Sequence, residues 1–509
     1  MNLPVQKWTS SGTAHAKRVE YTYEREPEKK LTYRFTEEKE HKTCTIEDDQ
    51  IVVVFPALRN LPDLSSLLYI EVSTDPDEHT RLKSLVLTSP SAQFMQDFSP
   101  ASHSWWQPQI GAGNTYQGPS LSVVLSTKSG NGQAESIYNN ILRPFLTHVS
   151  LNEGSDYTLL RTQSSDSITE LTLSTFLPRA TLGIPQTIVL LSGDGGIVDI
   201  VNGLLSSGPL SPKYAKPSIA LLPLGTGNAL AYSTGIAADQ TFGLAAFARG
   251  SPRPLPLFKA TFHHPDPTNG KAREQTIYGA VVFSWGLHAS LVADSDTPEY
   301  RKHGAARFQM AAKENLFPSN GTQPHAYRGT VSVLRKHAVA ATPPSDHLGN
   351  LILQPSSKTN TTSATSTNSA TTEHWEPIPR QEHAYVLATL VSNLEATFRI
   401  SPSSKPLDGQ LRLIHFGPLL GGGDAIMRIM GLAYAEGGHI GEAGVGYEAI
   451  EGLRIDFGDG PGEEEERWRR VCVDGRIVVV PKGGWVEVRM EERGVCDLVW
   501  LPRRGAMLV

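Results

Sequence analysis

The chain alternates short apolar runs with polar turns, and the way it does so divides the sequence into three parts. In about the first hundred residues the apolar runs are IVVVFPAL (51–58), LLYIEV (67–72) and LKSLVLTS (82–89), each followed by polar residues. Short runs rich in valine, leucine and isoleucine between polar turns indicate strands. The pattern therefore predicts a small β-rich unit over residues 1–117.

The second part repeats one plan three times: an apolar run, a glycine-containing turn, and a stretch typical of a helix. The plan occurs in GPSLSVVLSTKSGNGQAESIYNNILRPFL (118–146), in IVLLSGDGGIVDIVNGLL (188–205) and in PSIALLPLGTGNALAYSTG (217–235). Strands that alternate with helices favour a parallel sheet covered by helices. Residues 118–255 are therefore expected to form an α/β domain.

The third part, residues 256–509, is mostly a succession of strand-like runs. Examples are TIYGAVVFSWG, HAYVLATLVS, VCVDGRIVVVP and CDLVWL, and such runs predict a mainly antiparallel domain. One helix is expected over 424–438, ended by glycines. Its apolar face holds Ile426, Ile429, Met430 and Ala433. A disordered insertion is expected at about 340–380, because residues 354–375 have almost no apolar side chain.

Composition narrows the classes of function. The chain has 509 residues, 39% of them hydrophobic, and a formal net charge of −6; this charge argues against a nucleic-acid partner. The three cysteines lie far apart and form no CxxC pair, which favours a reducing compartment over a disulfide framework or a zinc site. No apolar run reaches the ~20 residues of a membrane-spanning helix. We therefore expect a soluble cytoplasmic protein that can still bind a membrane surface.

The three glycine turns carry the candidate chemistry. Glycine lets backbone N–H groups approach a phosphate closely, because it has no side chain and adopts positive φ. The turns lie at 126–132, 192–196 and 223–228, and the second holds a carboxylate, Asp194, between a buried strand and a helix. None has the GxxxxGK[ST] spacing of a P-loop or a complete GxGxxG. A single glycine turn is often only a tight connection, but three in one α/β unit favour phosphate chemistry.

The order of these motifs resembles a known family. SGDGGIVDIVNGL followed by PLGTGNALA resembles the paired nucleotide-binding motifs of the diacylglycerol kinase catalytic family. The serine before GDG, and Trp285-Gly286, resemble its sphingosine kinase and ceramide kinase branch. The segments KSGNGQAESIYNNILRPFL, FSWGLHASLVADSDTPEYRKHGAARF, YRGTVSVL, MRIMGLAYAEGGHI and VCVDGRIVVVP continue the likeness in order, from about residue 119 to about residue 490.

The resemblance implies a fold and an activity. The expected fold is a NAD-kinase-like α/β nucleotide domain followed by an antiparallel β-sandwich lipid-binding domain, with the active site where the two meet. The expected activity is transfer of the γ-phosphate of ATP, with Mg²⁺, to a hydroxyl of a long-chain lipid of the sphingoid base, ceramide or diacylglycerol type. The protein would visit the membrane peripherally, with helix 424–438 as a lid, and could form a homodimer.

The resemblance also assigns roles to single residues. Asp194 would be the general base that positions or deprotonates the acceptor hydroxyl. Thr162 matches a threonine that faces the nucleotide, and Arg301 and Arg307 match arginines that hold phosphates. The residues expected to cradle ATP are Ser129, Gly130, Gly132, Gly193, Gly195, Gly225, Thr226, Gly227 and Asn228.

The sequence departs from the family pattern in two places. Sphingosine kinases grip the substrate ammonium with an acidic residue after the WGF-like strand; aligned from the left this position reads Ser290, and aligned from Tyr300 it reads Asp294. Both stay open as substrate-binding candidates. The family also has Asp-Gly-Glu where this chain has Asp474-Gly475-Arg476. Asp474 is retained near the nucleotide and metal, but Arg476 inverts the second charge.

Two readings of different class follow. In one, the chain is an active lipid kinase, and Asp199, on the helix behind Asp194, supplies the missing negative charge to the metal. In this reading Arg476 contacts a phosphate of ATP. In the other, it is a retired kinase domain that binds lipid or a partner without transferring phosphate. Retention of Asp194, the GTGN turn and both arginines favours the enzyme.

Overall fold

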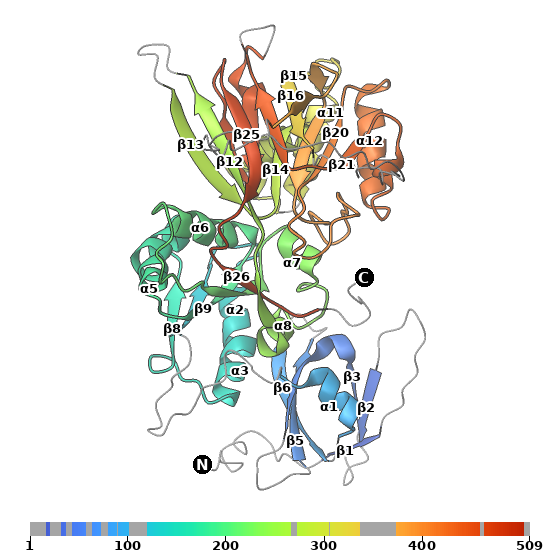
Figure 1. Ribbon diagram of the computed structural model, residues 1–509. Coiled ribbons are helices and arrows are strands. Elements are labelled where there is room, and N and C mark those ends of the chain that lie inside the picture. Colours follow the sequence, from blue (N-terminus) through green and yellow to red (C-terminus); the bar gives the residue numbers. More distant parts are fainter. Residues whose placement is uncertain are drawn as a thin grey trace, which may run out of the picture.

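The structure, a computed structural model, describes most of the chain in three connected parts (Figure 1). The described residues are 17–20, 32–36, 43–56, 64–72, 80–88, 90–100, 120–265, 272–304, 306–335, 373–458 and 463–502. The insertion expected at about 340–380 lies for the most part outside them. The blue N-terminal unit, the green α/β domain and the yellow-to-red β-rich domain follow one another from bottom to top in Figure 1.

The N-terminal unit is a curled sheet closed by a helix. Its strands run in the order β3-β2-β1-β6-β5-β4, and β3 and β4, at its two edges, are joined by only three residues, Asp48–Gln50. The two edges are thereby brought close together, and Phe94 and Phe98 of α1 (Ala92–Phe98) pack into the interior. The strands are β1 (Lys17–Glu20), β2 (Thr32–Thr36), β3 (Thr43–Glu47), β4 (Ile51–Phe55), β5 (Leu64–Glu71) and β6 (Arg81–Thr88). The β-rich expectation is confirmed.

This unit packs directly against the α/β domain. Val52 and Val53 of β4 share a buried core with Phe145 and Phe247. Arg249, at the end of α8 (Leu244–Arg249), lies over the Phe98 ring at 5.2 Å and donates to the carbonyls of Asp97 and Ile51. The N-terminal unit therefore extends the hydrophobic core of the α/β domain.

The α/β domain is a six-stranded sheet in the order β11-β26-β10-β9-β7-β8. Five strands are parallel, and β11 is antiparallel to β26. The strands are β7 (Ser120–Leu125), β8 (Tyr157–Arg161), β9 (Gln186–Ser192), β10 (Ser218–Pro223), β11 (Ser251–Pro254) and β26 (Asp497–Trp500). The sequence pattern placed CDLVWL among the antiparallel strands, and this was wrong: β26 runs parallel to β10. An apolar run of this kind is compatible with either sheet.

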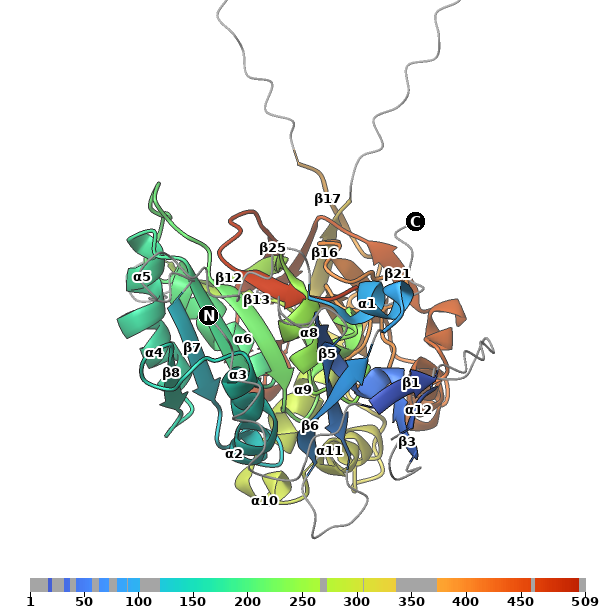
Figure 2. The same ribbon diagram turned by 90° about the horizontal axis from the view of Figure 1, so that it is seen from below.

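Helices cover both faces of this sheet, because side chains of a strand alternate between faces. Ile188 and Leu190 pack under α6 (Asp194–Leu205), whereas Val189 and Leu191 face α3 and α8. The remaining helical segments are α2 (Ala134–Ile137), η3 (Tyr138–Leu142), α3 (Arg143–His148), α4 (Ser167–Leu171), η4 (Thr172–Phe176), α5 (Leu177–Thr181) and α7 (Ala229–Thr234). Figure 2 shows from below α2 and α3, which follow each other along one helical stretch.

The third part is a sandwich of two antiparallel six-stranded sheets, which confirms the expected α/β plus β-sandwich fold. One sheet has the order β13-β12-β25-β22-β16-β17 and the other β21-β20-β19-β14-β23-β24. Phe258 and Phe262 of one sheet and Phe283 and Trp285 of the other are fully buried in the core that the sheets share. The strands are β12 (Leu257–His264), β13 (Arg273–Gly279), β14 (Val282–Gly286), β16 (Thr330–Leu334), β17 (Trp375–Pro377), β19 (Tyr385–Thr389), β20 (Arg412–Phe416), β21 (Gly446–Ala449), β22 (Gly452–Asp456), β23 (Arg470–Val473), β24 (Arg476–Val479) and β25 (Trp485–Glu491).

Four helices flank the sandwich: α9 (Leu287–Ser295), α10 (Pro298–Arg301), α11 (Ala306–Leu316) and α12 (Gly422–Ala433). The short strands β15 (Tyr327–Arg328) and β18 (Glu382–His383) pair with each other. In Figure 1, α12 lies outside the edge formed by β20 and β21. None of the described helices combines the length and the apolar composition needed to cross a bilayer.

Candidate active site

The three glycine turns meet at one edge of the parallel sheet. A Cβ at Gly130 would lie 2.2 Å from the carbonyl oxygen of Leu224, so the first turn touches the third. A Cβ at Gly193 would lie 2.7 Å from the Cα of Gly225, so the second turn also touches the third. These approaches exclude any side chain, which explains the glycines and confirms that the turns converge.

The third turn is held by its own asparagine. Asn228 accepts a hydrogen bond from the amide of Gly225 and donates one to its carbonyl, both at 2.8 Å. Asn228 has a φ of 53°, the left-handed region that asparagine tolerates better than most residues. Its side chain thus shapes the turn around Thr226 and Gly227, and a direct contact with ATP stays a prediction.

The first turn is tied to Thr162, which is buried. The Thr162 hydroxyl accepts from the amide of Thr127 at 3.1 Å, and its carbonyl accepts from the Thr127 hydroxyl at 3.0 Å. Within the turn the amide of Gly132 donates to the carbonyl of Ser129. Thr162 therefore shapes this glycine turn, and a contact with the nucleotide stays a prediction.

Asp194 is the first residue of α6, and its carboxylate is bound by the start of another helix. One oxygen accepts from the amide of Ala229 at 2.7 Å and the other from the amide of Leu230 at 3.1 Å. Burial raises the pKa of Asp194, and these two amides oppose the rise. Apart from its chain neighbours and the backbone of its own helix, no atom of the described residues lies within 4 Å of the position that a Cβ would take at Gly195. The carboxylate is thus fixed in place beside open space.

Asp474 reaches the same region from the hairpin between β23 and β24. With a φ of 49°, it accepts hydrogen bonds from the amides of Ala280, Val281 and Val282. Burial, with a contribution from the charge of nearby Asp194, raises the pKa of Asp474 to about 7. The resemblance predicted that Asp474 lies near the nucleotide. The hydrogen bonds from these three amides could not be predicted, because no local sequence pattern indicates them.

Asp199 and Arg476 form an ion pair between α6 and β24. The Nη2 of Arg476 lies 3.1 Å from Oδ1 of Asp199, and both side chains are partly exposed. Burial raises the pKa of Asp199, while Arg476 opposes the rise. The pair thus bridges the α/β domain and the sandwich, which the sequence did not foresee.

The carboxylates suit a Mg²⁺ that is carried by ATP phosphates. Mg²⁺ keeps several waters and typically takes only one or two carboxylates in phosphate-transfer sites. Asp194, Asp199 and Asp474 each hold protein donors already, and among the described residues no cluster of three or more potential metal ligands occurs. The residues therefore fit a metal reached through water and phosphate, with Asp199 and Asp474 as the candidates.

The two expected phosphate arginines belong to adjacent helices beside the sandwich. Arg307 of α11 lies 3.4 Å from Asp296 and over the Phe308 ring at 4.8 Å. Its Nε is buried and has no acceptor among the described residues. Arg301 is the last residue of α10, and its side chain lies outside the described part of the chain.

Neither substrate-binding candidate is an unpaired acid. Ser290 of α9 is buried and accepts a hydrogen bond from the Tyr327 hydroxyl at 2.8 Å. Asp294, one turn further along, lies 2.8 Å from Arg470 and also accepts from Asn315. This helix therefore presents a neutral side chain and a carboxylate whose charge is already compensated.

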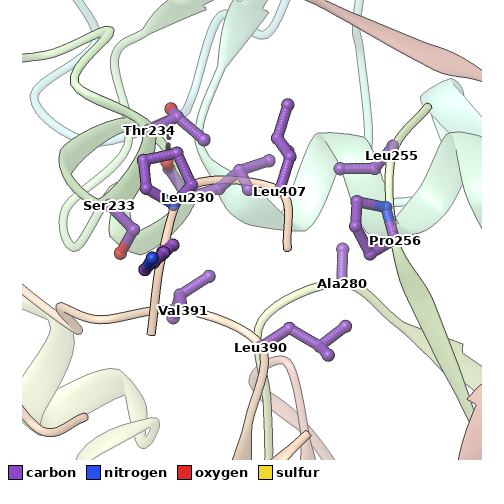
Figure 3. Close-up of a pocket in the computed structure, with 11 residues that line it drawn as sticks. Leu230, Ser233, Thr234, Leu255, Pro256, Ala280, Leu390, Val391 and Leu407 are labelled. Carbon is purple, nitrogen blue, oxygen red and sulfur yellow. Dashed lines mark hydrogen bonds between the residues drawn. The ribbon is translucent and has the colours of Figure 1, made fainter. Parts of the chain in front are cut away.

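A small, mostly apolar pocket opens where the α/β domain meets the sandwich (Figure 3). Leu230, Ser233 and Thr234 of α7 form one side. The rest of the lining is formed by Leu255, Pro256, Ala280, Leu390, Val391, Lys405, Pro406 and Leu407. The pocket adjoins the helix that binds Asp194, but the carboxylate itself does not line it.

Comparison with known proteins agrees with the motifs. Residues 120–260 match the family model of the diacylglycerol kinase catalytic domain. Human sphingosine kinase 1 is 23% identical over 368 residues, which cover 70% of this chain and 85% of that protein. Human sphingosine kinase 2 is 25% identical over 238 residues, 45% of this chain and 32% of that protein.

Among solved structures, a putative diacylglycerol kinase from Bacillus anthracis str. Sterne superposes with a TM-score of 0.47 at 14% identity. That superposition covers 75% of this chain and 97% of the bacterial one. The match to the catalytic domain coincides with the three glycine turns and Asp194. Residues 120–260 therefore carry a diacylglycerol kinase catalytic domain, and the chain is similar to human sphingosine kinase 1 over 70% of its length.

Proposed function

We propose that this protein transfers the γ-phosphate of ATP to a hydroxyl group of a long-chain lipid. The observation that carries the proposal is the position of Asp194. Its carboxylate is oriented by the amides of Ala229 and Leu230 where three glycine turns meet, and the adjacent Gly195 faces open space. Phosphoryl transfer depends mainly on positioning and on neutralising the charge of the phosphates, and the fixed carboxylate and the converging turns support the positioning.

Each group then has one task. Asp194 accepts the hydrogen bond of the acceptor hydroxyl, and its raised pKa suits a general base better than that of a free carboxylate. Backbone amides of the glycine turns bind the phosphates. The Nε of Arg307, which has no acceptor among the described residues, adds a cationic donor. Asp199 and Asp474 would hold, through water, a Mg²⁺ that enters with ATP, and that ion would supply neutralisation of the phosphate charge.

The charges near α9 favour an acceptor with a neutral head group. A free sphingoid base carries an ammonium, which needs an unpaired carboxylate in a dry site. Asp294 is already paired with Arg470, and Ser290 is neutral. We therefore expect a ceramide- or diacylglycerol-type acceptor in preference to a sphingoid base.

A lipid panel with labelled ATP tests this function. Mixed micelles of sphingosine, ceramide or diacylglycerol are incubated with the wild-type protein and with Asp194→Asn. We expect label in the neutral lipids, and loss of that label in the variant. Label in sphingosine alone would overturn the acceptor class, and no label in any lipid would overturn the kinase.

One observation favours a second candidate, a lipid- or partner-binding protein without phosphoryl transfer. Arg476 occupies the place of the family's glutamate and neutralises Asp199. On this account Arg476→Glu would create a pair of facing carboxylates and so raise Mg²⁺ affinity, while the wild type transfers no phosphate. On the kinase account the wild type is active, and Arg476→Glu weakens ATP binding. Isothermal titration with Mg²⁺ and with ATP, beside the lipid assay, separates the two.

A long-chain acceptor also requires access to a bilayer. We propose that this protein is cytoplasmic and binds the membrane peripherally, with α12 and its flanking residues as the contact surface. Leu420 is fully exposed, and Met427 and Tyr434 are about half exposed. Ile426 and Ile429, expected to take part in lipid entry, are instead buried in the core. Their side chains hold the helix on the protein, so the bilayer would meet Leu420, Met427 and Tyr434.

A further inference from the structure

Residues 391–400, which we term the strap, run from the sandwich across α7. The Ser233 hydroxyl of α7 donates to the carbonyl of Asn393 at 3.1 Å and accepts from its amide at 2.9 Å. The carbonyl of Leu394 lies 3.5 Å from the position of a Cβ at Gly227. Figure 3 shows Ser233 and Val391 on the same side of the pocket. Two hydrogen bonds of one buried hydroxyl thus fasten the strap to α7.

The other end of the strap is fastened to the end of α12. The Phe398 ring lies 4.8 Å from the ring of Tyr434 in an edge-on arrangement. The amide of Arg399 donates to the carbonyl of Ala433 at 3.0 Å, and its guanidinium lies 2.8 Å from Glu436. A displacement of the end of α12 therefore pulls directly on the strap.

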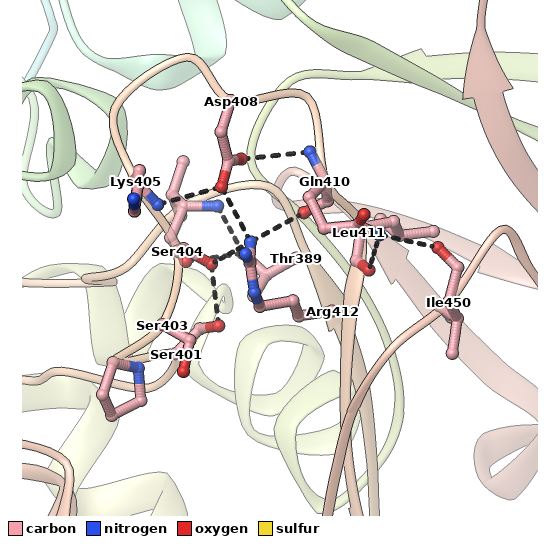
Figure 4. A network of polar contacts seen from close by, with 12 residues as sticks. Thr389, Ser401, Ser403, Ser404, Lys405, Asp408, Gln410, Leu411, Arg412 and Ile450 are labelled. Atoms are coloured by element: carbon pink, nitrogen blue, oxygen red, sulfur yellow. Dashed lines mark hydrogen bonds and ion pairs between the residues drawn. The ribbon is translucent and has the colours of Figure 1, made fainter. Parts of the chain in front are cut away.

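A polar network makes this end of the strap stiff (Figure 4). The hydroxyls of Ser401 and Ser404 lie 2.8 Å apart, and Arg412 of β20 donates to Asp408 at 3.0 Å and to Ser404 at 3.4 Å. The amide of Ser401 also donates to the carbonyl of Ser392, so the strap is closed on itself. A stiff, closed segment transmits a displacement where a flexible one would absorb it.

We propose that Ser233 is a positioning residue, through which the strap couples the position of α12 to the orientation of Asp194. The amides that bind the Asp194 carboxylate belong to Ala229 and Leu230, one turn before Ser233 on the same short helix. When lipid or membrane displaces the end of α12, the strap shifts α7 and these two amides with it. The proposal rests on the proposed function for its catalytic meaning, but the mechanical coupling exists independently of it.

Amide hydrogen exchange tests the coupling without any substrate. Tyr434→Ala removes the ring contact at the α12 end, and we expect exchange at the amides of Ala229 and Leu230 to become at least several-fold faster. Arg428→Ala is the matched control, because Arg428 lies on the same helix and pairs with Glu442, away from the strap. Phe398→Leu serves as a milder second variant if Tyr434→Ala lowers the melting temperature strongly. Unchanged exchange at both amides would overturn the proposal.

Kinetics of Ser233 variants test the positioning role. Ser233→Ala is expected to lower kcat about tenfold, since small misplacements of reacting groups are costly, with the KM for ATP within about twofold. Ser233→Thr keeps the hydroxyl and should recover most of the activity. An unchanged kcat in Ser233→Ala, beside an active wild type, would overturn the positioning role. An inactive wild type would overturn the proposed function, whereas the exchange result would still decide on the coupling.

Discussion

Asp194 and Asp474 are two carboxylates of different domains that come close enough to influence each other, and both are bound by backbone amides. Asp194 begins a helix and accepts one amide on each oxygen. Asp474 stands in a hairpin with positive φ, and its carboxylate accepts from three successive amides. The carboxylate of Asp194 can thus still accept further hydrogen bonds, whereas the acceptor sites of the Asp474 carboxylate are largely filled.

The surroundings make the difference clear. Beside Asp194, Gly195 is exposed and its Cβ position is open, so a ligand hydroxyl can approach. Asp474 holds the turn at 280–282, whose Val281 carbonyl also accepts from Thr389 and Leu390. We infer that Asp194 serves the reaction directly, whereas Asp474 mainly holds the joint between the domains and would meet a metal only through water. Substitutions at the two positions should therefore separate activity from stability.

The largest effect is expected for Asp194→Asn. The amide keeps the size of the side chain but removes the charge and the ability to accept a proton, so turnover should fall by a factor on the order of 10² or more. Phosphorylation of the neutral lipids measures this. Asp156→Asn, in an exposed turn of the same domain, is the control and should stay active. Near wild-type turnover in Asp194→Asn would abolish the distinction between the two carboxylates.

Asp474→Asn should mainly cost stability. An asparagine presents only one acceptor oxygen, so the free energy of unfolding should fall by about 1–3 kcal/mol, the cost of leaving buried donors unpaired. Urea unfolding followed by fluorescence gives the value. A loss of activity without loss of stability would instead place Asp474 in the catalytic machinery.

The pH dependence of stability sharpens the same comparison. The pKa of Asp474 is raised from 3.8 to about 7, so the native state keeps a proton that the unfolded state releases. The free energy of unfolding should therefore decrease as the pH rises from about 4 to about 7, and change little above. Asp474→Asn should make the free energy of unfolding depend less on pH. Part of the dependence should remain, because the pKa of Asp194 is also raised. Unfolding at pH 5, 6, 7 and 8 tests the sign; a slope that steepens in the variant would contradict it.

Arg476→Ala tests the charge that lies between the domains. Its partner Asp199 is partly exposed, and pairs of this kind contribute about 0–1 kcal/mol to stability. If the guanidinium also contacts a phosphate, ATP affinity should fall by a larger amount, about 1.5–3 kcal/mol. Titration calorimetry measures the affinity. If ATP affinity is unchanged in an active Arg476→Ala variant, Arg476 has no phosphate contact and only its ion pair with Asp199 remains.

The smallest effect is expected on α12. Met427→Glu replaces an exposed apolar side chain, and removing it from a bilayer contact should reduce liposome association by roughly 1–2 kcal/mol, with unchanged folding. Liposome flotation measures association. Ile429→Glu would place a charge in the core and should unfold the helix, so it cannot report on membrane contact. Equal flotation of Met427→Glu and wild type would move the contact surface elsewhere.

The sequence predicted those features of the fold that depend on residues close together in the chain. Glycines between a strand and a helix indicated turns that pack backbone on backbone, and Gly130, Gly193 and Gly225 do so. The sequence could not predict contacts between distant segments. The bonds from the amides at 280–282 to Asp474 join residues almost two hundred positions apart. Likewise, Asp294 lies on helix α9, whereas the Arg470 that neutralises it belongs to strand β23. Nor can an apolar run such as CDLVWL show which sheet it joins.

That run has a consequence for biosynthesis. β26 (Asp497–Trp500) is an interior strand of the α/β sheet, with β10 on one side and β11 on the other, and in the described part of the chain β11 pairs with β26 alone. Domains generally fold as units in the order in which the ribosome delivers them. Here the α/β domain cannot complete its sheet until β26 is translated, after the whole sandwich. The nascent chain therefore exposes the unpaired edge of β10 while the sandwich is synthesised. The need for chaperones should therefore grow with the length of the sandwich, and a chain truncated before β26 should fail to complete the α/β domain.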